Sequence, residues 1–142
     1  MLQRVREASV SVEGRTIARC GRGLVVLLGI ATGDDAERAR RLATKIAELR
    51  IFDDEVGRFD RSLLDVGGEA LVVSQFTLLA DVSRGRRPSF AAAAPAEVAE
   101  PLYEEFCAAL AEHGVRVARG AFGARMQVLL VNDGPVTIVL DV

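Results

Sequence analysis

The sequence predicts a single α+β domain over residues 1–142, with about seven strands in a mostly antiparallel curled sheet or β-barrel and two helices. Three observations indicate this fold class. The chain has 142 residues and is half hydrophobic, which suits one domain with its own core. Its apolar runs are short and separated by glycine-containing turns, as in strands. Only two segments repeat apolar residues at the spacing of an amphipathic helix.

Three strands are expected at the start of the chain, at 2–12, 16–20 and 24–28. Turns at 13–15 and 21–23, each with glycine, separate them. The third strand contains only apolar residues and is therefore expected to be buried. Because both connections are tight, we expect the three strands to form an antiparallel meander.

Two helices are expected. The first begins at Asp34, with Glu37 three residues later completing a capping-box-like pair. The second begins near Pro95, a residue favoured in the first turn, and ends at His113, before Gly114. The apolar stripe of the first helix is Ala39, Leu42, Ala43, Ile46 and Leu49, and that of the second is Val98, Leu102, Phe106, Ala109 and Leu110.

The remaining strands follow from shorter apolar runs. Residues 53–68 are expected to form a polar loop, and residues 81–89 a basic, irregular segment. The strands themselves are expected at 51–52, 70–76, 115–119, 126–132 and 136–142, the last two forming a hairpin.

Composition excludes several classes of function. The net charge is −2 and the isoelectric point about 5.5, so contact with RNA would need a local basic patch. The longest apolar run, 24–31, is too short to span a bilayer, and no basic-then-apolar leader precedes the first strand, which predicts a cytoplasmic protein. One histidine and two cysteines, Cys20 and Cys107, argue against a zinc site or a histidine-dependent triad. We therefore expect no metal and no cofactor, and buried, inert cysteines.

The segment Asn132-Asp133-Gly134-Pro135-Val136-Thr137 is the most informative in the chain. Proline cannot donate a hydrogen bond to a sheet, and glycine in a strand costs backbone entropy. A fold that keeps this pair is expected to use its backbone for function, although most Gly-Pro pairs are only turns. The expected partner is Ser74-Gln75-Phe76-Thr77-Leu78, at the end of another strand, which alternatively is a strand fraying into a turn.

These residues favour one kind of chemistry over another. A Ser74 or Thr77 nucleophile needs a base, and the sequence offers no histidine for that role. Backbone N–H groups fixed around a carbonyl oxygen can instead stabilise an oxyanion while water or a substrate hydroxyl attacks. Gly134 suits the close backbone approach that such a site requires.

Two further segments are candidate binding elements. Arg84, Arg86 and Arg87 lie beside Phe90 and indicate either a solvated loop or a phosphate clamp on single-stranded or duplex-end RNA. Phe122 and Met126 flank a turn, where they either line a pocket or belong to the core.

Together these segments resemble the D-aminoacyl-tRNA deacylase family, also described as D-Tyr-tRNA deacylases. The resemblance covers the whole chain, and its motifs occur in the family's order. The segments that carry it are Gln3-Arg4-Val5, Ala8-Ser9-Val10, Ser74-Gln75-Phe76-Thr77-Leu78, Arg87-Pro88-Ser89-Phe90, Phe122-Gly123-Ala124-Arg125-Met126-Gln127-Val128 and Asn132-Asp133-Gly134-Pro135-Val136-Thr137.

The resemblance implies an enzyme of translation quality control that hydrolyses the ester of D-aminoacyl-tRNA, and of mischarged glycyl-tRNA. It implies a homodimer with active sites at the subunit interface, in which a cis Gly134-Pro135 peptide from one subunit enters the other's pocket and excludes L-amino acids. Residues 74–77 would surround the ester, with backbone N–H groups near Phe76 and Thr77 as the oxyanion hole. Phe122 and Met126 would shape the site for the terminal adenosine.

The resemblance also implies that the 2′-hydroxyl of the terminal ribose assists catalysis. Two alternatives remain open at this point. One is a dimeric RNA-end binding module without catalysis, which would need the arginine-rich segment but not Gly134-Pro135. The other is an esterase in which Thr77 is the nucleophile.

Overall fold

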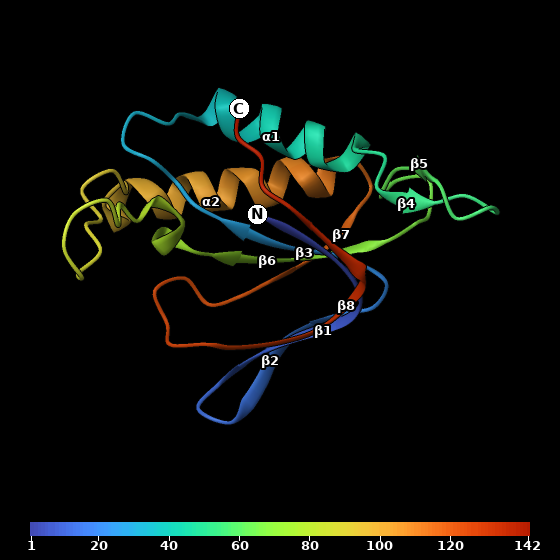
Figure 1. Ribbon diagram of the computed structural model, residues 1–142, viewed down its shortest axis with the longest axis horizontal. Coiled ribbons are helices and arrows are strands. Elements are labelled where there is room, and N and C mark those ends of the chain that lie inside the picture. Colours follow the sequence, from blue (N-terminus) through green and yellow to red (C-terminus); the bar gives the residue numbers. More distant parts are fainter.

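The computed structural model describes residues 1–142 and contains two helices that pack together over one face of a strongly curled sheet (Figure 1). Neither helix is long and apolar enough to cross a membrane. The elements are β1 (Leu2–Val12), β2 (Arg15–Cys20), β3 (Gly23–Leu28), α1 (Ala36–Glu48), β4 (Phe52–Asp53), β5 (Phe59–Arg61), β6 (Glu69–Ser74), the 3₁₀ helix η1 (Phe76–Leu79), α2 (Ala96–Glu112), β7 (Arg116–Arg119) and β8 (Gln127–Ile138).

The predicted fold class is confirmed, with a nearly closed, barrel-like sheet of mixed strands. The strand order is β2-β1-β3-β6-β7, and β8 pairs with β1. Strand β1 is antiparallel to β2, β3 and β8, whereas β3, β6 and β7 run parallel. The larger hydrophobic cluster fills the space between helices and sheet, and a smaller one lies on the opposite face.

The predicted meander is wrong, because β3 pairs with β1 and not with β2. Strand β1 is long enough to serve both neighbours: Ala8–Val12 pairs with β2, and Leu2–Val5 pairs with β3. Gly23 allows β3 to approach the start of β6 closely, since a Cβ there would lie 1.8 Å from the Glu69 carbonyl oxygen. Tight turns alone did not reveal this arrangement.

The predicted C-terminal hairpin is also wrong. Strand β8 runs along β1 without reversing, with Val5 opposite Asn132 and Gln3 opposite Thr137. Residues 133–136 therefore form a bulge within one strand. The Asn132 side chain closes it, accepting a hydrogen bond from the Val136 N–H at 2.8 Å and donating to Thr137 Oγ1 at 3.1 Å. The bulge accommodates a proline that a regular ladder would not.

The helices occur where predicted, with local differences. Asp35 caps α1 by accepting from the Arg38 N–H, whereas Asp34 accepts from the Ala31 N–H in the preceding turn. Pro95 precedes α2. Val98 is exposed, which contradicts its predicted place in the apolar stripe; the buried positions of α2 are Ala99, Tyr103, Phe106, Cys107, Ala109 and Leu110.

Two strand boundaries also differ from prediction. Strand β6 ends at Ser74, and Phe76 lies in the 3₁₀ helix η1. The predicted polar loop 53–68 contains strand β5, which pairs with β4 in a short hairpin. Neither strand extends beyond three residues, which explains why apolar periodicity missed the hairpin.

Candidate active site

The motif at 74–77 lies at the carboxyl end of the central parallel strand β6. The Gln75 N–H donates to the Leu28 carbonyl oxygen at 2.8 Å, and the Gln75 side-chain amide donates to Thr77 Oγ1. Gly29 packs tightly behind η1, because a Cβ there would lie 2.6 Å from Leu79 Cδ2. The segment therefore has a fixed conformation and leaves the Phe76 ring exposed.

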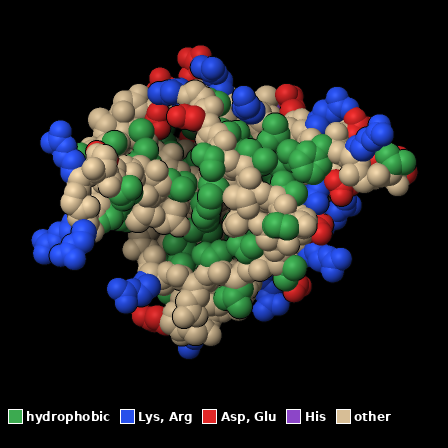
Figure 2. Space-filling model, viewed as in Figure 1, with side chains coloured by type: hydrophobic (Ala, Val, Ile, Leu, Met, Phe, Trp, Pro, Cys, Tyr) green, Lys and Arg blue, Asp and Glu red, His purple; other side chains and the backbone are tan.

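An aromatic pair joins this motif to the arginine-rich segment. The rings of Phe76 and Phe90 meet edge to face with their centroids 5.0 Å apart. Two backbone hydrogen bonds between Asp81 and Ser89, 2.8 and 2.9 Å long, close the loop that precedes Phe90. The loop projects at the left of Figure 1, and Lys and Arg side chains stand out along that edge in Figure 2.

The arginines of this loop are free to meet a ligand. Arg84, Arg86 and Arg87 are all exposed, and none forms an ion pair within the chain. By contrast, Arg116 and Arg119 on β7 pair with carboxylates. The loop thus carries uncompensated positive charge on a protein of net charge −2.

The predicted adenosine-site residues lie at the same edge of the sheet. Strands β6 and β7 are parallel, so their carboxyl ends lie together, and the Gly120 N–H donates to the Val72 carbonyl oxygen at 2.9 Å. Phe122 is half-buried against Tyr103, with ring centroids 5.9 Å apart. Met126 Sδ lies 2.9 Å from where a Gly120 Cβ would be. The structure thus brings residues 74–77, Phe90, Phe122 and Met126 to one edge.

The Gly134-Pro135 peptide is cis and lies elsewhere. Its bulge lies opposite Arg4 of β1, and Arg4 is paired with Leu24 of β3. Ser74 of β6 is paired with Leu28, which lies four residues further along β3. That offset of four residues is about 13 Å along the strands. Strands β1 and β3 also lie between β8 and β6. Within one chain, the 74–77 motif and the Gly134-Pro135 bulge therefore lie apart.

Arg4 holds the Gly-Pro bulge, a role that the sequence analysis missed. Its side chain is 8% exposed. Its Nε donates to the Asp133 carbonyl oxygen at 2.9 Å, and its Nη1 donates to the Ile51 carbonyl oxygen at 2.9 Å and pairs with Asp53 at 3.2 Å. The alternation Leu2, Arg4 on one face of β1 was the available signal, because it directs a cation inward.

Comparisons with known proteins match the chain over almost its whole length. The family model described as D-Tyr-tRNA(Tyr) deacylase matches residues 1–141. The chain belongs to this family. The D-aminoacyl-tRNA deacylase of Roseiflexus castenholzii is 63% identical over 141 residues, which are 99% of this chain and 90% of that protein. The predicted enzyme class, a hydrolase of the D-aminoacyl-tRNA deacylase type, is confirmed.

Two solved structures resemble the chain as a whole. The structure of a c-Myc DNA unwinding element binding protein has a TM-score of 0.93 and 44% sequence identity, covering 99% of this chain and 96% of that one. A probable eukaryotic D-amino acid tRNA deacylase has a TM-score of 0.84 at 21% identity, covering 94% and 93%. At that identity the second likeness concerns the fold alone.

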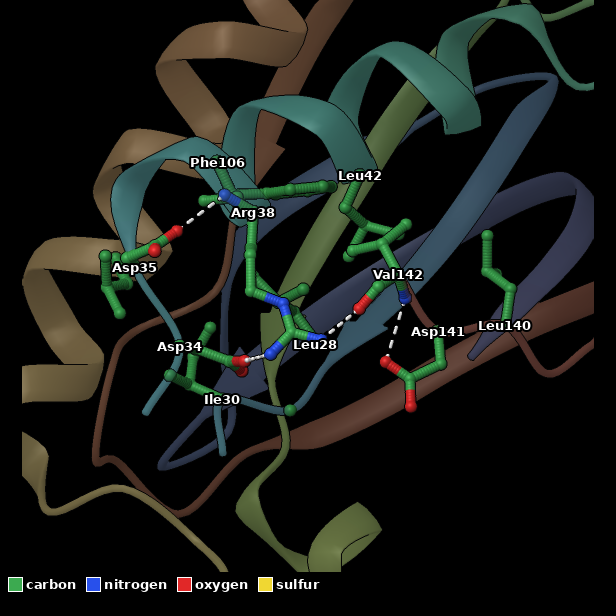
Figure 3. Close-up of a pocket in the computed structure, with 13 residues that line it drawn as sticks. Leu28, Ile30, Asp34, Asp35, Arg38, Leu42, Phe106, Leu140, Asp141 and Val142 are labelled. Atoms are coloured by element: carbon green, nitrogen blue, oxygen red, sulfur yellow. Dashed lines mark hydrogen bonds and ion pairs between the residues drawn. The ribbon is translucent and has the colours of Figure 1, made fainter. Parts of the chain in front are cut away.

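The deacylase motifs do not line the small cavity beside the two helices. That cavity, of about 70 Å³, lies between the end of β3, both helices and the C-terminal residues (Figure 3). Arg38 crosses it to pair with Asp34 at 3.1 Å and to donate to the Val142 carbonyl oxygen. Its volume suits a few water molecules and not the end of a tRNA.

The titratable groups offer no ordinary nucleophile to this deacylase-family site. Burial raises the pKa of both Cys20 and Cys107 to about 11, so both remain thiols at neutral pH. The His113 ring meets Thr44 Oγ1 at 3.0 Å between the two helices, away from the 74–77 edge. No group of three or more His, Cys, Asp or Glu side chains is arranged to hold a metal ion. The polar groups at the edge are hydroxyls, an amide and backbone N–H groups.

Proposed function

We propose that the protein is a homodimeric proofreading enzyme that hydrolyses D-aminoacyl-tRNA and mischarged glycyl-tRNA in the cytoplasm, releasing the amino acid and free tRNA. One observation carries the proposal: the cis Gly134-Pro135 bulge is built rigidly, yet it lies far from the 74–77 edge of its own chain. Only a second copy can present the bulge to that edge. Each active site then contains the 74–77 edge of one subunit and Gly134-Pro135 of the other.

The outer face of β8 supports a second copy as the partner. Strand β8 pairs only with β1, which leaves one long edge free. Leu129 and Val131 point outward, with 58% and 46% of their surfaces exposed. They line a hollow of about 370 Å³ together with residues of β1 and β2. An apolar edge strand of this length is an aggregation hazard unless another chain covers it.

The chemistry follows from the backbone at the start of η1. Phe76 and Thr77 are its first two residues, so their N–H groups have no acceptor within the helix, and Gln75 provides no side-chain cap. In the proposed mechanism these N–H groups bind the ester carbonyl oxygen as negative charge develops. Water attacks the carbonyl carbon and gives up a proton to the 2′-oxygen, while the 2′-hydroxyl passes its own proton to the 3′-oxygen. The bond between the carbonyl carbon and the 3′-oxygen then breaks, which releases the amino acid and a ribose with both hydroxyls restored. Thr77 needs no nucleophilic role.

Chiral selection follows from exclusion. The carbonyl groups of Gly134 and Pro135 of the second copy would accept hydrogen bonds from the α-amino group and occupy the volume that an L side chain requires. A D side chain points away from this volume, and glycine has none. Phe122 and Met126 would contact the terminal adenosine, while Arg84, Arg86 and Arg87 contact tRNA phosphates.

The first test is hydrolysis of matched D-tyrosyl-tRNA and L-tyrosyl-tRNA by the purified protein. We expect rapid loss of the D ester while the L ester is spared. Equal loss of both would indicate a general esterase and direct attention to Thr77. No loss of either, with tRNA still bound, would indicate an RNA-end binding module.

A second test separates the two catalytic mechanisms. Thr77→Ala is expected to retain an appreciable rate, whereas a substrate with a 2′-deoxy terminal adenosine is expected to lose it. Full activity on the deoxy substrate, together with an inactive Thr77→Ala variant, would establish the nucleophile mechanism instead.

A further inference from the structure

We propose that the β4–β5 hairpin sets the stringency of chiral selection, with Asp53 and Phe59 as positioning residues that hold Arg4 against the Gly-Pro bulge. This inference rests on the proposed function of Gly134-Pro135. It assigns a role to a hairpin that none of the sequence motifs includes. The hairpin projects at the right of Figure 1, on the opposite side from the arginine loop.

The hairpin contacts the Arg4 guanidinium in three ways. The Ile51 carbonyl oxygen, just before β4, accepts from Nη1 at 2.9 Å. The Asp53 carboxylate lies 3.2 Å from the same nitrogen. The Phe59 ring on β5 stacks over the guanidinium, with its centroid 5.6 Å from Cζ. The cation is therefore bounded by a carbonyl group, a carboxylate and an aromatic face of one short element.

The other side of the same guanidinium faces the bulge. Nε donates to the Asp133 carbonyl oxygen, and Nη2 lies 3.3 Å from the position of a Gly134 Cβ. Because the guanidinium is planar and rigid, a displacement of its hairpin side displaces its bulge side as well. Arg4 thus transmits the position of the β4–β5 hairpin to the Gly134-Pro135 carbonyl groups.

Selection by exclusion depends strongly on the position of the Gly134-Pro135 bulge relative to the substrate side chain. A D-aminoacyl ester keeps its side chain out of the excluded volume and meets the bulge only through hydrogen bonds from its α-amino group, which tolerate a small displacement, so its hydrolysis changes little. An L side chain is rejected by close contact, so the same displacement admits it. Loosening the hairpin should therefore raise the rate on the L ester more than it lowers the rate on the D ester.

The experiment compares Asp53→Asn, Phe59→Leu and the double variant on matched D- and L-tyrosyl-tRNA. We expect each single change to lower the ratio of D to L rates about threefold to tenfold, as for a partly exposed ion pair or cation–π contact. Phe59→Tyr retains the aromatic face and should retain the wild-type ratio. Val56→Ala is the matched control, because Val56 belongs to the same hairpin turn, is exposed and does not contact Arg4.

A second readout is independent of catalysis. The Arg4 Nε–H, which donates to the Asp133 carbonyl oxygen, should exchange with solvent faster in Asp53→Asn and Phe59→Leu than in the wild type and the controls, as measured by NMR on ¹⁵N-labelled protein. A wild-type rate ratio with wild-type Nε–H exchange in the double variant would overturn the inference. Equal loss of D and L rates would also overturn it, since that indicates general destabilisation. A wild-type protein without chiral preference would refute the proposed function, and the exchange measurement would still test the positioning.

Discussion

At the scale of the residue, one substitution can test whether the N–H groups at the start of η1 stabilise the oxyanion. Phe76 is the first residue of the 3₁₀ helix, where proline is tolerated because that N–H has no intrahelical acceptor. Phe76→Pro removes the N–H and the ring, whereas Phe76→Ala removes only the ring. If the N–H stabilises the oxyanion, kcat should fall by about 10²–10³ in Phe76→Pro.

Phe76→Ala is the matched control for that prediction. It should bind substrate less tightly because its ring no longer packs on Phe90, raising KM more than it lowers kcat. The measurement is steady-state hydrolysis of D-tyrosyl-tRNA, with circular dichroism to confirm that both variants fold. Equal kcat values for the two variants would show that the Phe76 N–H does not contribute to catalysis.

Single residues also show how far the sequence could predict the site. Residues 74–77, Phe122 and Met126 were predicted as site residues because their residue types are unusual at strand ends and turns. The structure gathers them at one edge, and their role in the site stays a prediction. Arg4 was missed because its role depends on Asp53, Ile51 and Asp133, which are distant in sequence. Only its place on the inward face of β1 marked it in advance.

At the scale of the element, local signals located the strands and helices but not their pairing. The caps and apolar stripes of α1 and α2 act within a few residues, so their positions were predictable to within one turn. Strand pairing depends on contacts across the chain. The two halves of β1 choose different partners, and β8 continues through a bulge closed by Asn132. No short-range pattern distinguishes such a bulge from a hairpin turn.

The prediction at this scale concerns tRNA binding by the arginines of the loop at 81–89. Replacing Arg84, Arg86 and Arg87 with alanine should raise KM for D-aminoacyl-tRNA with little change in kcat, because in the proposed complex these side chains contact phosphates and not the ester. The salt dependence of tRNA binding should also weaken, by about 0.7–0.9 in slope for each phosphate that the variant no longer neutralises. The measurement is tRNA affinity over a series of salt concentrations.

The matched control removes three other cations. Arg15, Arg41 and Lys45 are exposed and form no ion pairs, so replacing them changes the net charge equally. If both triple variants show the same decrease in affinity and slope, binding reflects overall charge and the 81–89 loop has no specific role.

At the scale of the whole molecule, the separation between the 74–77 edge and the Gly134-Pro135 bulge is the reason for proposing a site shared between two subunits. Within one chain the Gly134-Pro135 bulge lies about 13 Å along the strands from Ser74, with two strands between. In a two-fold symmetric dimer every contact occurs twice, so if one bulge meets the 74–77 edge of the other subunit, the second bulge meets the first subunit's edge as well. The free edge and exposed apolar face of β8 provide a surface for that contact.

Subunit complementation tests this arrangement directly. Gly134→Ala places a Cβ 2.8 Å from Val136 Cγ2, at a backbone φ of +140° that disfavours any side chain, so it should inactivate the bulge. In the other chain, Phe76→Pro inactivates the 74–77 edge. If the bulge acts across the interface, a purified Phe76→Pro/Gly134→Ala heterodimer has one doubly defective site and one intact site. It should therefore recover about half of the wild-type activity, although each homodimer is nearly inactive. If each bulge served its own subunit, both sites would carry one defect and the heterodimer would stay inactive.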